Sequence, residues 1–354
     1  MRFRLLLLPF SWIYALVTLI RNKLFDRGKL PSTAYSIPVI SVGNITVGGT
    51  GKTPLTEHLI RLLQPHYQMA LLSRGYGRKS KGVIEVDHLA TYDSIGDEPM
   101  QMKQKFPNLR VVVAEKRTLG MGVLLAQSPP PQIVVMDDAY QHRYVKPGLS
   151  ILVTDYHRPM WKDFCFPAGN LREPISGAER SQIIVVSKCP TNLSEEEAKN
   201  IKEKLNIASH QKIYFSTIEY GVPKQLKKFN STQSFKDALA KNNVPLTVVA
   251  GIGNPKPFFK MAQQFDVPTK DIQFKDHHHF TASDLNKIEK CASNSEGLSG
   301  LILTTEKDAV RLKASEYLSK ELAQLIWYIP IQPKFLMDGE TSFNETILNY
   351  IKRT

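Results

Sequence analysis

Short apolar runs alternate with amphipathic segments along most of the 354-residue chain. In the first part of the chain, apolar runs that predict strands lie at residues 37–42, 69–72, 110–113, 132–136, 150–153 and 182–186. Several are apolar at consecutive positions, which is typical of parallel strands covered by helices on both faces. Leucines at helical spacing predict a helix over 54–64, and a capping-box pattern predicts another over 194–205. The alternation therefore indicates an α/β fold with a mostly parallel sheet.

The second part of the chain repeats this style with different content. Apolar runs at 246–250, 301–305 and 325–331 predict strands, and residues 257–265 and 283–292 predict helices. Between the two parts, residues 215–235 are polar and rich in turn formers. We therefore expect three units, namely a hydrophobic N-terminal helix at 1–28, an α/β domain at 29–220 and a smaller α/β domain at 221–354.

The segment from Leu5 to Ile20 holds sixteen residues without a charge, flanked on both sides by basic residues. As a helix it is about 24 Å long, slightly short of the ~30 Å hydrocarbon core of a membrane. A cleaved signal peptide needs a small-residue cleavage site, whereas bulky and basic residues follow here. A buried core helix fits poorly with Pro9 and the basic flanks. A membrane anchor fits better, with Trp12 and Tyr14 as interfacial rings, and the pattern leaves open whether it spans the bilayer or lies in one leaflet.

Composition adds constraints on partners and compartment. The chain has 46 Lys and Arg against 33 Asp and Glu, a formal charge of +13. Such a surplus favours an anionic partner, which could be a nucleic acid, an anionic membrane surface or a phosphorylated substrate. No zinc-finger or RNA-recognition signature occurs in the sequence, so nucleic acid is not an expected partner. Three distant cysteines argue against a disulfide framework and favour a reducing cytosol.

The strongest motif is GNITVGGTGKTP at residues 43–54, between a predicted strand and a predicted helix. This is the context of a phosphate-binding loop, whose glycines let backbone N–H groups point at phosphate oxygens. Lys52 is expected to reach the β- and γ-phosphates, and Thr53 to place its hydroxyl on Mg²⁺. The strict pattern has glycine at position 46, where this chain has Thr46. A glycine-rich turn that only packs the strand against the helix is the structural alternative. The expected nucleotide-binding residues are Gly48, Gly49, Thr50, Gly51, Lys52 and Thr53.

Two acidic pairs are candidates for the rest of a phosphoryl-transfer site. Asp137 and Asp138 directly follow an apolar run, as a Walker-B acid does, although such a pair can also merely cap a turn. Asp97 and Glu98 lie between a glycine and a proline. A carboxylate there could accept a proton from an attacking hydroxyl, whereas an isolated pair of this kind more often caps a helix.

Histidines and arginines complete the set of candidates. Three adjacent histidines at 277–279 cannot all face one ion from a regular strand, so a metal site is not expected there. A histidine that orients an acid or tunes its pKa is the functional interpretation, and a solvated polar loop is the alternative. Arginines follow several predicted strands, on the side where α/β proteins bind ligands, although any one of them could be an ordinary surface charge. These arginines are Arg74, Arg117 and Arg172.

The motifs together resemble the tetraacyldisaccharide 4'-kinase family. They are VGNITVGGTGKTP, SRGYGR, GDEP, DDAYQHR, PAGNLREP, DHH and TEKDAV, in this order behind a hydrophobic N-terminus, and they extend to about residue 311. The resemblance implies a P-loop domain joined to a smaller α/β domain. It implies transfer of the γ-phosphoryl group of ATP, with Mg²⁺, to the 4'-hydroxyl of a tetraacylated glucosamine disaccharide 1-phosphate, which forms lipid IVA. It also implies a peripheral or anchored location on the cytoplasmic face of the bacterial inner membrane, and no obligate protein partner is expected.

The resemblance also implies roles for matching residues. Asp97 is the expected general base, supported by His277, with His278 as the competing choice. Lys52 is expected to act on the transferred phosphate. The expected magnesium-side residues are Thr53, Asp137, Asp138 and Glu173, with Glu98 as a neighbour in the site, and the expected substrate or phosphate contacts are Arg74, Arg117 and Arg172. The TEKDAV segment, around Lys307 and Asp308, has no role that the sequence supports.

One other class of function is compatible with a phosphate-binding loop behind a hydrophobic segment. A membrane-associated P-loop ATPase or GTPase, acting as a switch or assembly factor, would transfer the phosphoryl group to water. The chain has no guanine-specifying N-K-x-D segment, and SKCP at 187–190 does not serve as one. The kinase is therefore the preferred interpretation.

Overall fold

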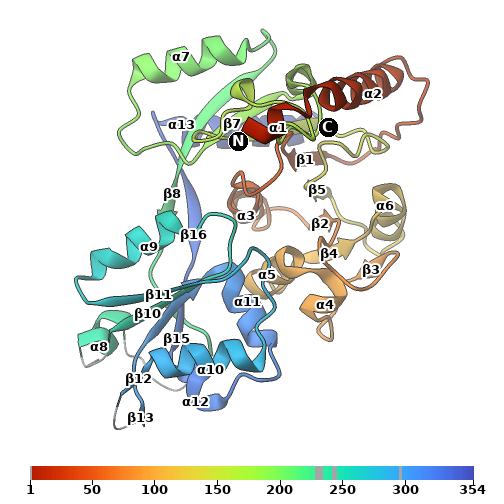
Figure 1. Ribbon diagram of the computed structural model, residues 1–354. Helices are drawn as coiled ribbons and strands as arrows, with labels where there is room; N and C mark the ends of the chain where they lie inside the picture. Colours follow the sequence, from red (N-terminus) through yellow and green to blue (C-terminus); the bar gives the residue numbers. More distant parts are fainter. Residues whose placement is uncertain (1, 228–233, 241–244, 295–296) are drawn as a thin grey trace.

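The computed structural model describes residues 2–227, 234–240, 245–294 and 297–354. Two sheets form the cores of two units, and two long strands run between the units (Figure 1). The expected α/β class, with a large mostly parallel sheet and a second, smaller α/β unit, is confirmed.

The larger sheet has nine strands in the order β16-β8-β7-β6-β1-β5-β2-β4-β3. Its inner strands pair in parallel, and the edge strands β3 and β16 pair antiparallel with their neighbours. The strands are β1 (Val39–Gly43), β2 (Met69–Ser73), β3 (Ile84–Glu85), β4 (Arg110–Val113), β5 (Ile133–Asp137), β6 (Leu149–Asp155), β7 (Ile183–Ser187), β8 (Lys212–Tyr220) and β16 (Ile331–Phe335). Every residue of β1, β2, β5, β6 and β7 is buried, which explains their consecutive apolar positions.

Helices cover both faces of this sheet. The helices with core residues on one face are α3 (Lys52–Leu63), α5 (Asp97–Lys105), which follows the short α4 (Tyr92–Ile95), and α13 (Gly339–Lys352). Those on the other face are α6 (Arg117–Leu125) and α7 (Glu195–Leu205), with the 3-10 turns η1 (Met160–Lys162) and η2 (Ile175–Arg180). Along β1, Ile40 and Val42 face α3, whereas Val39 faces the opposite core, as the strand period of two requires.

The smaller sheet has the order β11-β10-β14-β15-β9. Its strands are β9 (Lys224–Gln225), β10 (Leu246–Ala250), β11 (Thr269–Gln273), β14 (Ile302–Thr305) and β15 (Ile326–Ile329), beside a hairpin of β12 (Ser293–Asn294) and β13 (Gly297–Leu298). One face is covered by α8 (Phe235–Ala240) and α9 (Lys256–Ala262), which η3 (Gln263–Phe265) extends, and the other by α10 (Ala282–Cys291), α11 (Glu306–Ala314) and α12 (Lys320–Leu325).

The apolar run at 325–331 forms two strands instead of the single strand that its pattern predicts. Proline has no backbone N–H for a sheet, and the chain leaves the smaller sheet at Pro330. Residues 331–352 then return to the larger sheet as β16, antiparallel to β8, and as α13. The expected division after residue 220 groups these residues with the second unit, whereas the strand pairing joins them to the first.

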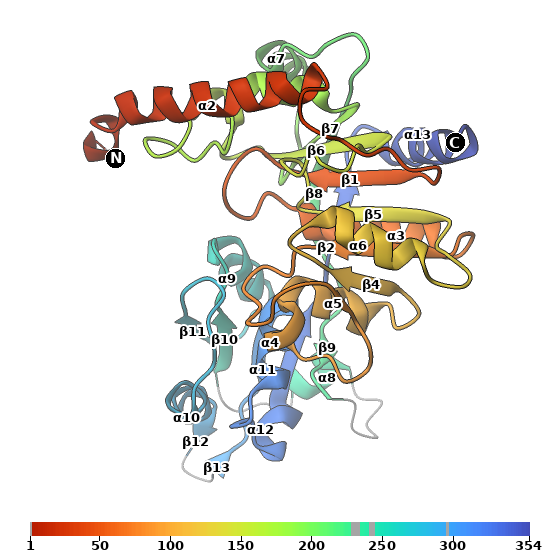
Figure 2. The same cartoon turned by 90° about the vertical axis from the view of Figure 1, so that its right-hand side faces the viewer.

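The hydrophobic N-terminal segment forms α1 (Arg2–Leu5) and α2 (Leu8–Asp26). Pro9 lies in the first turn of α2, where a missing N–H does no harm. Figure 2 shows α2 extended across one end of the larger unit. Its Ser11 hydroxyl accepts a hydrogen bond from the N–H of Ala168 at 2.8 Å, while Leu6 and Trp12 are exposed. Neither α2 nor any other helix within the described ranges is long and apolar enough to cross a membrane.

Candidate active site

The segment from the last residue of β1 to the first two residues of α3, residues 43–53, is called the phosphate loop below. Gly51 precedes α3 with φ +89°, a left-handed conformation that favours glycine, and a Cβ there would lie 3.1 Å from the Ser187 hydroxyl oxygen. The Asn44 amide braces the loop from inside by donating to the Thr50 hydroxyl at 2.9 Å. The first turn of α3 leaves backbone N–H groups without helical partners. The loop therefore presents donors to an anion at the end of β1.

Thr46 occupies the position where the strict motif has glycine. It is buried, it forms a β-bridge with Leu171, and its φ lies outside the left-handed region. The adjacent Val47 N–H donates to the carbonyl of Asn170 at 2.8 Å. The start of the loop is therefore held by the segment around Leu171, and a residue with a side chain fits there.

Asp137 and Asp138 lie beside the phosphate loop because β5 pairs with β1, with Asp137 opposite Val42. The Lys52 ammonium lies 3.2 Å from Asp138 Oδ1, and Arg172 Nη1 lies 3.3 Å from the same carboxylate. The Thr56 hydroxyl donates to Asp137 Oδ1 at 3.3 Å. The structure thus brings together the loop lysine and both acids that the sequence singles out.

The pKa values of these two acids move in opposite directions. Burial raises the pKa of Asp137 to about 7, with Glu98 and Asp138 adding like charge. Burial also disfavours the charge on Asp138, but Lys52 and Arg172 more than offset it and lower its pKa below the usual range. A cluster of carboxylates whose negative charges repel one another favours a bound cation.

The donor set suits a hard divalent cation. The Thr53 hydroxyl lies 3.3 Å from Glu98 Oε1, and the charges of Glu98 and Asp138 both act on Asp137. All the candidate ligand atoms are therefore oxygens. Across the part of the chain that the structure describes, no three His, Cys, Asp or Glu side chains form a complete metal cage. Mg²⁺ seldom uses such a cage, since it commonly binds one or two carboxylates together with phosphates and water. The residues present therefore fit Mg²⁺ bound together with a nucleotide.

Asp97 begins α5, next to the phosphate loop, and is buried. Its Oδ2 accepts hydrogen bonds from His277 Nδ1 at 2.9 Å and from Arg311 Nη2 at 2.5 Å, and its Oδ1 accepts from the N–H of Glu98 at 2.9 Å. Burial opposes the charge on Asp97, but the His277 hydrogen bond and the cations Lys307 and Arg311 hold its pKa well below the usual range. The hydrogen bond to Asp97 raises the pKa of His277.

The other two histidines of the run lie elsewhere. His278 Nε2 lies 2.9 Å from Asp284 Oδ2, and its ring stacks on Phe274. His279 lies against the Tyr92 hydroxyl. The structure therefore places His277, and not His278, on Asp97.

Arg117 does not occupy the exposed position that a substrate contact requires. It is 0% exposed, and its guanidinium donates to the carbonyl oxygens of Ala114 at 2.5 Å and Asp137 at 3.3 Å. Burial lowers its pKa to about 10, so that it stays charged at neutral pH. Arg117 supports the end of β5 from within the domain, and this position differs from the expected role.

Glu173 also lies apart from the expected magnesium set. It is buried, and Arg180 binds both of its oxygens at 2.8 and 3.1 Å. Asn22 of α2 and Gln141 donate to the same carboxylate at 2.7 and 2.8 Å. These donors occupy Glu173, which ties α2 to the loop that follows Asp138.

Arg74 is exposed after β2, and it makes no hydrogen bond or ion pair within the described ranges.

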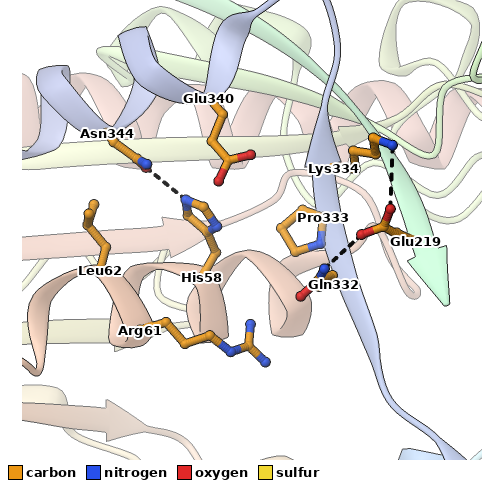
Figure 3. Close-up of a pocket in the computed structure, with 9 residues that line it drawn as sticks. All are labelled: His58, Arg61, Leu62, Glu219, Gln332, Pro333, Lys334, Glu340 and Asn344. Atoms are coloured by element: carbon orange, nitrogen blue, oxygen red, sulfur yellow. Dashed lines mark hydrogen bonds and ion pairs between the residues drawn. The ribbon is translucent and has the colours of Figure 1, made fainter. Parts of the chain in front are cut away.

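A cavity of about 430 Å³ lies behind α3, away from the phosphate loop (Figure 3). It lies between α3, α13 and the strands β8 and β16, and His58 and Arg61 form its α3 side. Its polar groups pair with one another: His58 with Asn344 at 2.8 Å, and Glu219 with Gln332 at 2.7 Å. None of the residues expected in the site lines this cavity.

Sequence reasoning missed the cations that face the acidic pair from the second unit. Lys307 Nζ lies 2.6 Å from Glu98 Oε1, and Arg311 contacts Asp97. The two cations are four residues apart on α11, a spacing that puts them on one helix face. That spacing was a visible signal, but their partners lie more than two hundred positions earlier in the chain.

Comparisons with known proteins point to one protein family along nearly the whole chain. The family model described as tetraacyldisaccharide-1-P 4'-kinase (LpxK) matches residues 3–352. The tetraacyldisaccharide 4'-kinase of Bacteroides thetaiotaomicron is 43% identical over 352 residues, covering 98% of this chain and 93% of its own. That of Flavobacterium johnsoniae is 45% identical over 349 residues, covering 99% and 97%. The crystal structure of the "apo" form of LpxK from Aquifex aeolicus in complex with ATP is similar with a TM-score of 0.74, 28% identity and 99% coverage of both chains.

Proposed function

This chain belongs to the tetraacyldisaccharide-1-P 4'-kinase family, and on that premise we propose that it transfers the γ-phosphoryl group of ATP to the 4'-hydroxyl of a tetraacylated glucosamine disaccharide 1-phosphate. The product is lipid IVA, a precursor of lipid A. One observation carries the proposal for this chain: the acidic pair of α5 lies against the phosphate loop, with Thr53 donating to Glu98 at 3.3 Å. A candidate proton acceptor and a phosphate-binding lysine therefore lie at one edge of the sheet.

The phosphate loop is the proposed site of the ATP phosphates. Its support is the left-handed Gly51, the open first turn of α3 and the Lys52 ammonium at the same end of the helix. Lys52 exchanges its partner Asp138 for phosphate oxygens when the nucleotide binds, and it then offsets negative charge on the transferred group. The similar LpxK structure from Aquifex aeolicus is a complex with ATP, which supports the same nucleotide here.

Mg²⁺ is the proposed metal, held by Thr53, Asp137 and Asp138 with Glu98 close by. When bound, it supplies positive charge to the phosphates. Asp137, whose pKa lies at about 7 through burial and neighbouring carboxylates, is the acid whose ionisation a cation favours most. Glu173 is not part of this proposed set, because Arg180 and two amides occupy its carboxylate.

Asp97 is the proposed acceptor of the proton from the 4'-hydroxyl. His277 and Arg311 bind its Oδ2, which leaves Oδ1 as the oxygen with room for a further donor. The lowered pKa keeps Asp97 ionised at neutral pH. A weak base suffices because phosphoryl transfer has a loose transition state, in which the proton leaves the attacking hydroxyl late.

Arg172, beside Asp138, and the exposed Arg74 are the proposed contacts for anionic groups of nucleotide or acceptor.

The proposed location is an anionic membrane surface on the cytoplasmic side, with α2 lying in the interface. Support comes from the exposed apolar side chains of α2 and of the turn before it, among them Leu6, Phe10, Trp12, Ile13, Leu16 and Val17. Basic residues flank them at both ends, as anionic headgroups favour. Because Tyr14 of the same helix donates to the carbonyl of Arg172 at 2.9 Å, the membrane-facing helix lies directly beside the proposed site. A lipid acceptor is therefore within reach of the site from the bilayer.

One assay tests the proposed function. The purified full-length protein is incubated with γ-labelled ATP, MgCl₂ and a tetraacylated glucosamine disaccharide 1-phosphate in mixed micelles, and label is scored on lipid and as free phosphate. The expected result is label on the lipid, at the 4' position. Free phosphate that does not depend on the lipid would instead identify the ATPase alternative.

A further inference from the structure

Two helices meet where the two units face each other, and one of them, α11, carries charges that the sequence motifs left unexplained. Figures 1 and 2 both show α11 of the smaller unit beside α5 of the larger one. Arg311 contacts Asp97 and Lys307 contacts Glu98, at 2.5 and 2.6 Å. The first turn of α5, which carries the proposed proton acceptor, is thus bound by one face of α11.

Arg311 is itself held rigidly from behind. Its Nη1 donates to the carbonyl of Gly251 and to Asp308 Oδ1, both at 2.9 Å. Asp308 Oδ2 in turn accepts from the Gly251 N–H at 2.9 Å and from the Thr305 hydroxyl at 2.6 Å. The guanidinium is 1% exposed at the side chain, so it has one orientation set by the smaller unit. A planar donor fixed in this way can fix the carboxylate that it binds.

The contact determines which oxygen of Asp97 is available. Arg311 donates to Oδ2 through both Nε, at 3.2 Å, and Nη2, at 2.5 Å. His277, also from the smaller unit, donates to the same oxygen at 2.9 Å. Among the residues that the structure describes, Oδ1 accepts only from the N–H of Glu98, so it keeps a lone pair for a hydroxyl.

We propose that Arg311 is a positioning residue for phosphoryl transfer: it aims Asp97 Oδ1 at the acceptor hydroxyl and makes this geometry depend on contact between the two units. The proposal rests on the proposed kinase function and deepens it. It gives the TEKDAV segment a role, because Thr305 and Asp308 hold the guanidinium that follows three residues later. Arg311 acts on the reaction through Asp97 and touches neither substrate.

A matched contact on the same two helices provides the control. Glu306 of α11 lies 2.8 Å from Lys105 at the far end of α5, and Lys105 has a second partner in Glu57 at 2.6 Å. Glu306→Gln removes one charged contact between the units and leaves Lys105 paired. It therefore measures the effect of weaker docking without altering Asp97.

The test measures kcat and the KM for ATP and for lipid acceptor in full-length variants. Arg311→Lys, which keeps the charge and loses the fork, should lower kcat about ten-fold, and Arg311→Met about 100-fold, the scale of a ~1 Å misplacement. Both should leave the KM for ATP within about three-fold, because the phosphate loop is unchanged. Glu306→Gln should keep kcat within about three-fold of wild type. In an Asp97→Asn background, Arg311→Met should cause no further loss, because it acts through the same carboxylate.

The outcomes separate this inference from the proposed function. A wild-type protein that transfers no label to lipid contradicts the kinase itself. A wild-type protein that does so, together with a folded Arg311→Lys of unchanged kcat, overturns the positioning role, as does an equal loss in Glu306→Gln. Thermal unfolding and ATP binding show whether each variant is folded. If Arg311→Met does not fold, the kcat of Arg311→Lys alone tests the positioning role.

Discussion

The imidazole of His277 lies 2.9 Å from the carboxylate of Asp97, although 180 positions separate them in the chain. The contact joins the two α/β units at the edge of the phosphate loop. In the proposed reaction this titratable pair lies where the acceptor hydroxyl loses its proton, which makes the pair a sensitive target for substitution.

Asp97→Asn keeps the shape of the side chain and removes its basicity. We expect kcat to fall by about 10²–10⁴-fold, the usual contribution of a positioned base, with ATP affinity nearly unchanged. Steady-state kinetics with the lipid acceptor and calorimetric ATP titration measure the two quantities. Asp93→Asn, which removes an exposed ion pair with Lys79, is the control and should behave like wild type. Near-normal turnover of Asp97→Asn would rule out this residue as the base.

The Asp97–His277 pair also makes stability depend on pH. The contact raises the pKa of His277 above its ordinary 6.5, so its contribution to stability is fully present below that value and disappears as the pH rises through the raised pKa. The stability difference between wild type and His277→Gln should therefore be largest near about pH 5.5 and smaller near about pH 8.5. Urea unfolding at both pH values measures it. A difference that stays constant, or that grows with pH, contradicts the pairing.

Two glycines should respond differently to the same change. Gly51→Ala forces alanine into φ +89° and against Ser187, whereas a Cβ at Gly122, in α6, meets no atom within 4 Å. Strain of about 1–3 kcal/mol is expected at Gly51, enough to weaken ATP binding about ten-fold or more. Gly122→Ala is the matched control and should bind ATP within about three-fold of wild type. Equal losses in the two variants would show that strain at Gly51 is not what matters.

The exposed face of α2 should bind anionic vesicles. Trp12 and Leu16 are 68% and 56% exposed, and burying each in lipid contributes about 1.5–3 kcal/mol. The double variant Trp12→Glu, Leu16→Glu should therefore lose vesicle binding by well over ten-fold in co-sedimentation. Leu89→Glu changes a side chain that is 73% exposed on a different surface and serves as the control. If both variants bind like wild type, α2 is not the docking face.

Substitutions at Arg117 and Arg74 should distinguish an arginine that stabilises the fold from one that binds a ligand. Arg117→Met removes a fully buried cation that holds the Asp137 carbonyl, and should lower the free energy of unfolding by about 3 kcal/mol. Arg74→Met, at an exposed position, should leave stability within about 0.5 kcal/mol. Chemical denaturation measures both. Unchanged stability of Arg117→Met, with a raised KM for the acceptor, would restore the substrate contact that the sequence led us to expect.

The central parallel strands of both sheets could be predicted because they are buried on both faces, whereas the partly exposed strands β3, β8, β9 and β11 were not predicted. A parallel strand such as β5 needs apolar residues at consecutive positions, and this pattern is visible in one dimension. The return of the chain at Pro330 could not be predicted, because β16 is specified by its pairing with β8, more than a hundred positions away. Local pattern identifies elements, and it says little about which sheet an element joins.

The candidate site also has parts that the sequence predicts and parts that only the fold reveals. The phosphate loop and Asp137 follow from strand, glycine and acid in sequence, and the pairing of Asp97 with His277 came from the family resemblance. The burial of Arg117 and Glu173 could not be read from the sequence because charged residues are usually exposed, and only the fold shows the partners that satisfy them. Arg311 was missed because its partner lies in the other unit.

The crossing at Pro330 also has a consequence for synthesis. The ribosome releases β16 and α13 only after the entire smaller unit has emerged, yet Phe343, Ile347 and Ile351 of α13 are core residues of the first sheet. The nucleotide-binding half is therefore incomplete during most of translation, with the edge of β8 unpaired and a hydrophobic face uncovered. Vectorial folding of this chain cannot complete the larger half before the smaller one has emerged, and a nascent chain halted near residue 300 should depend on chaperones.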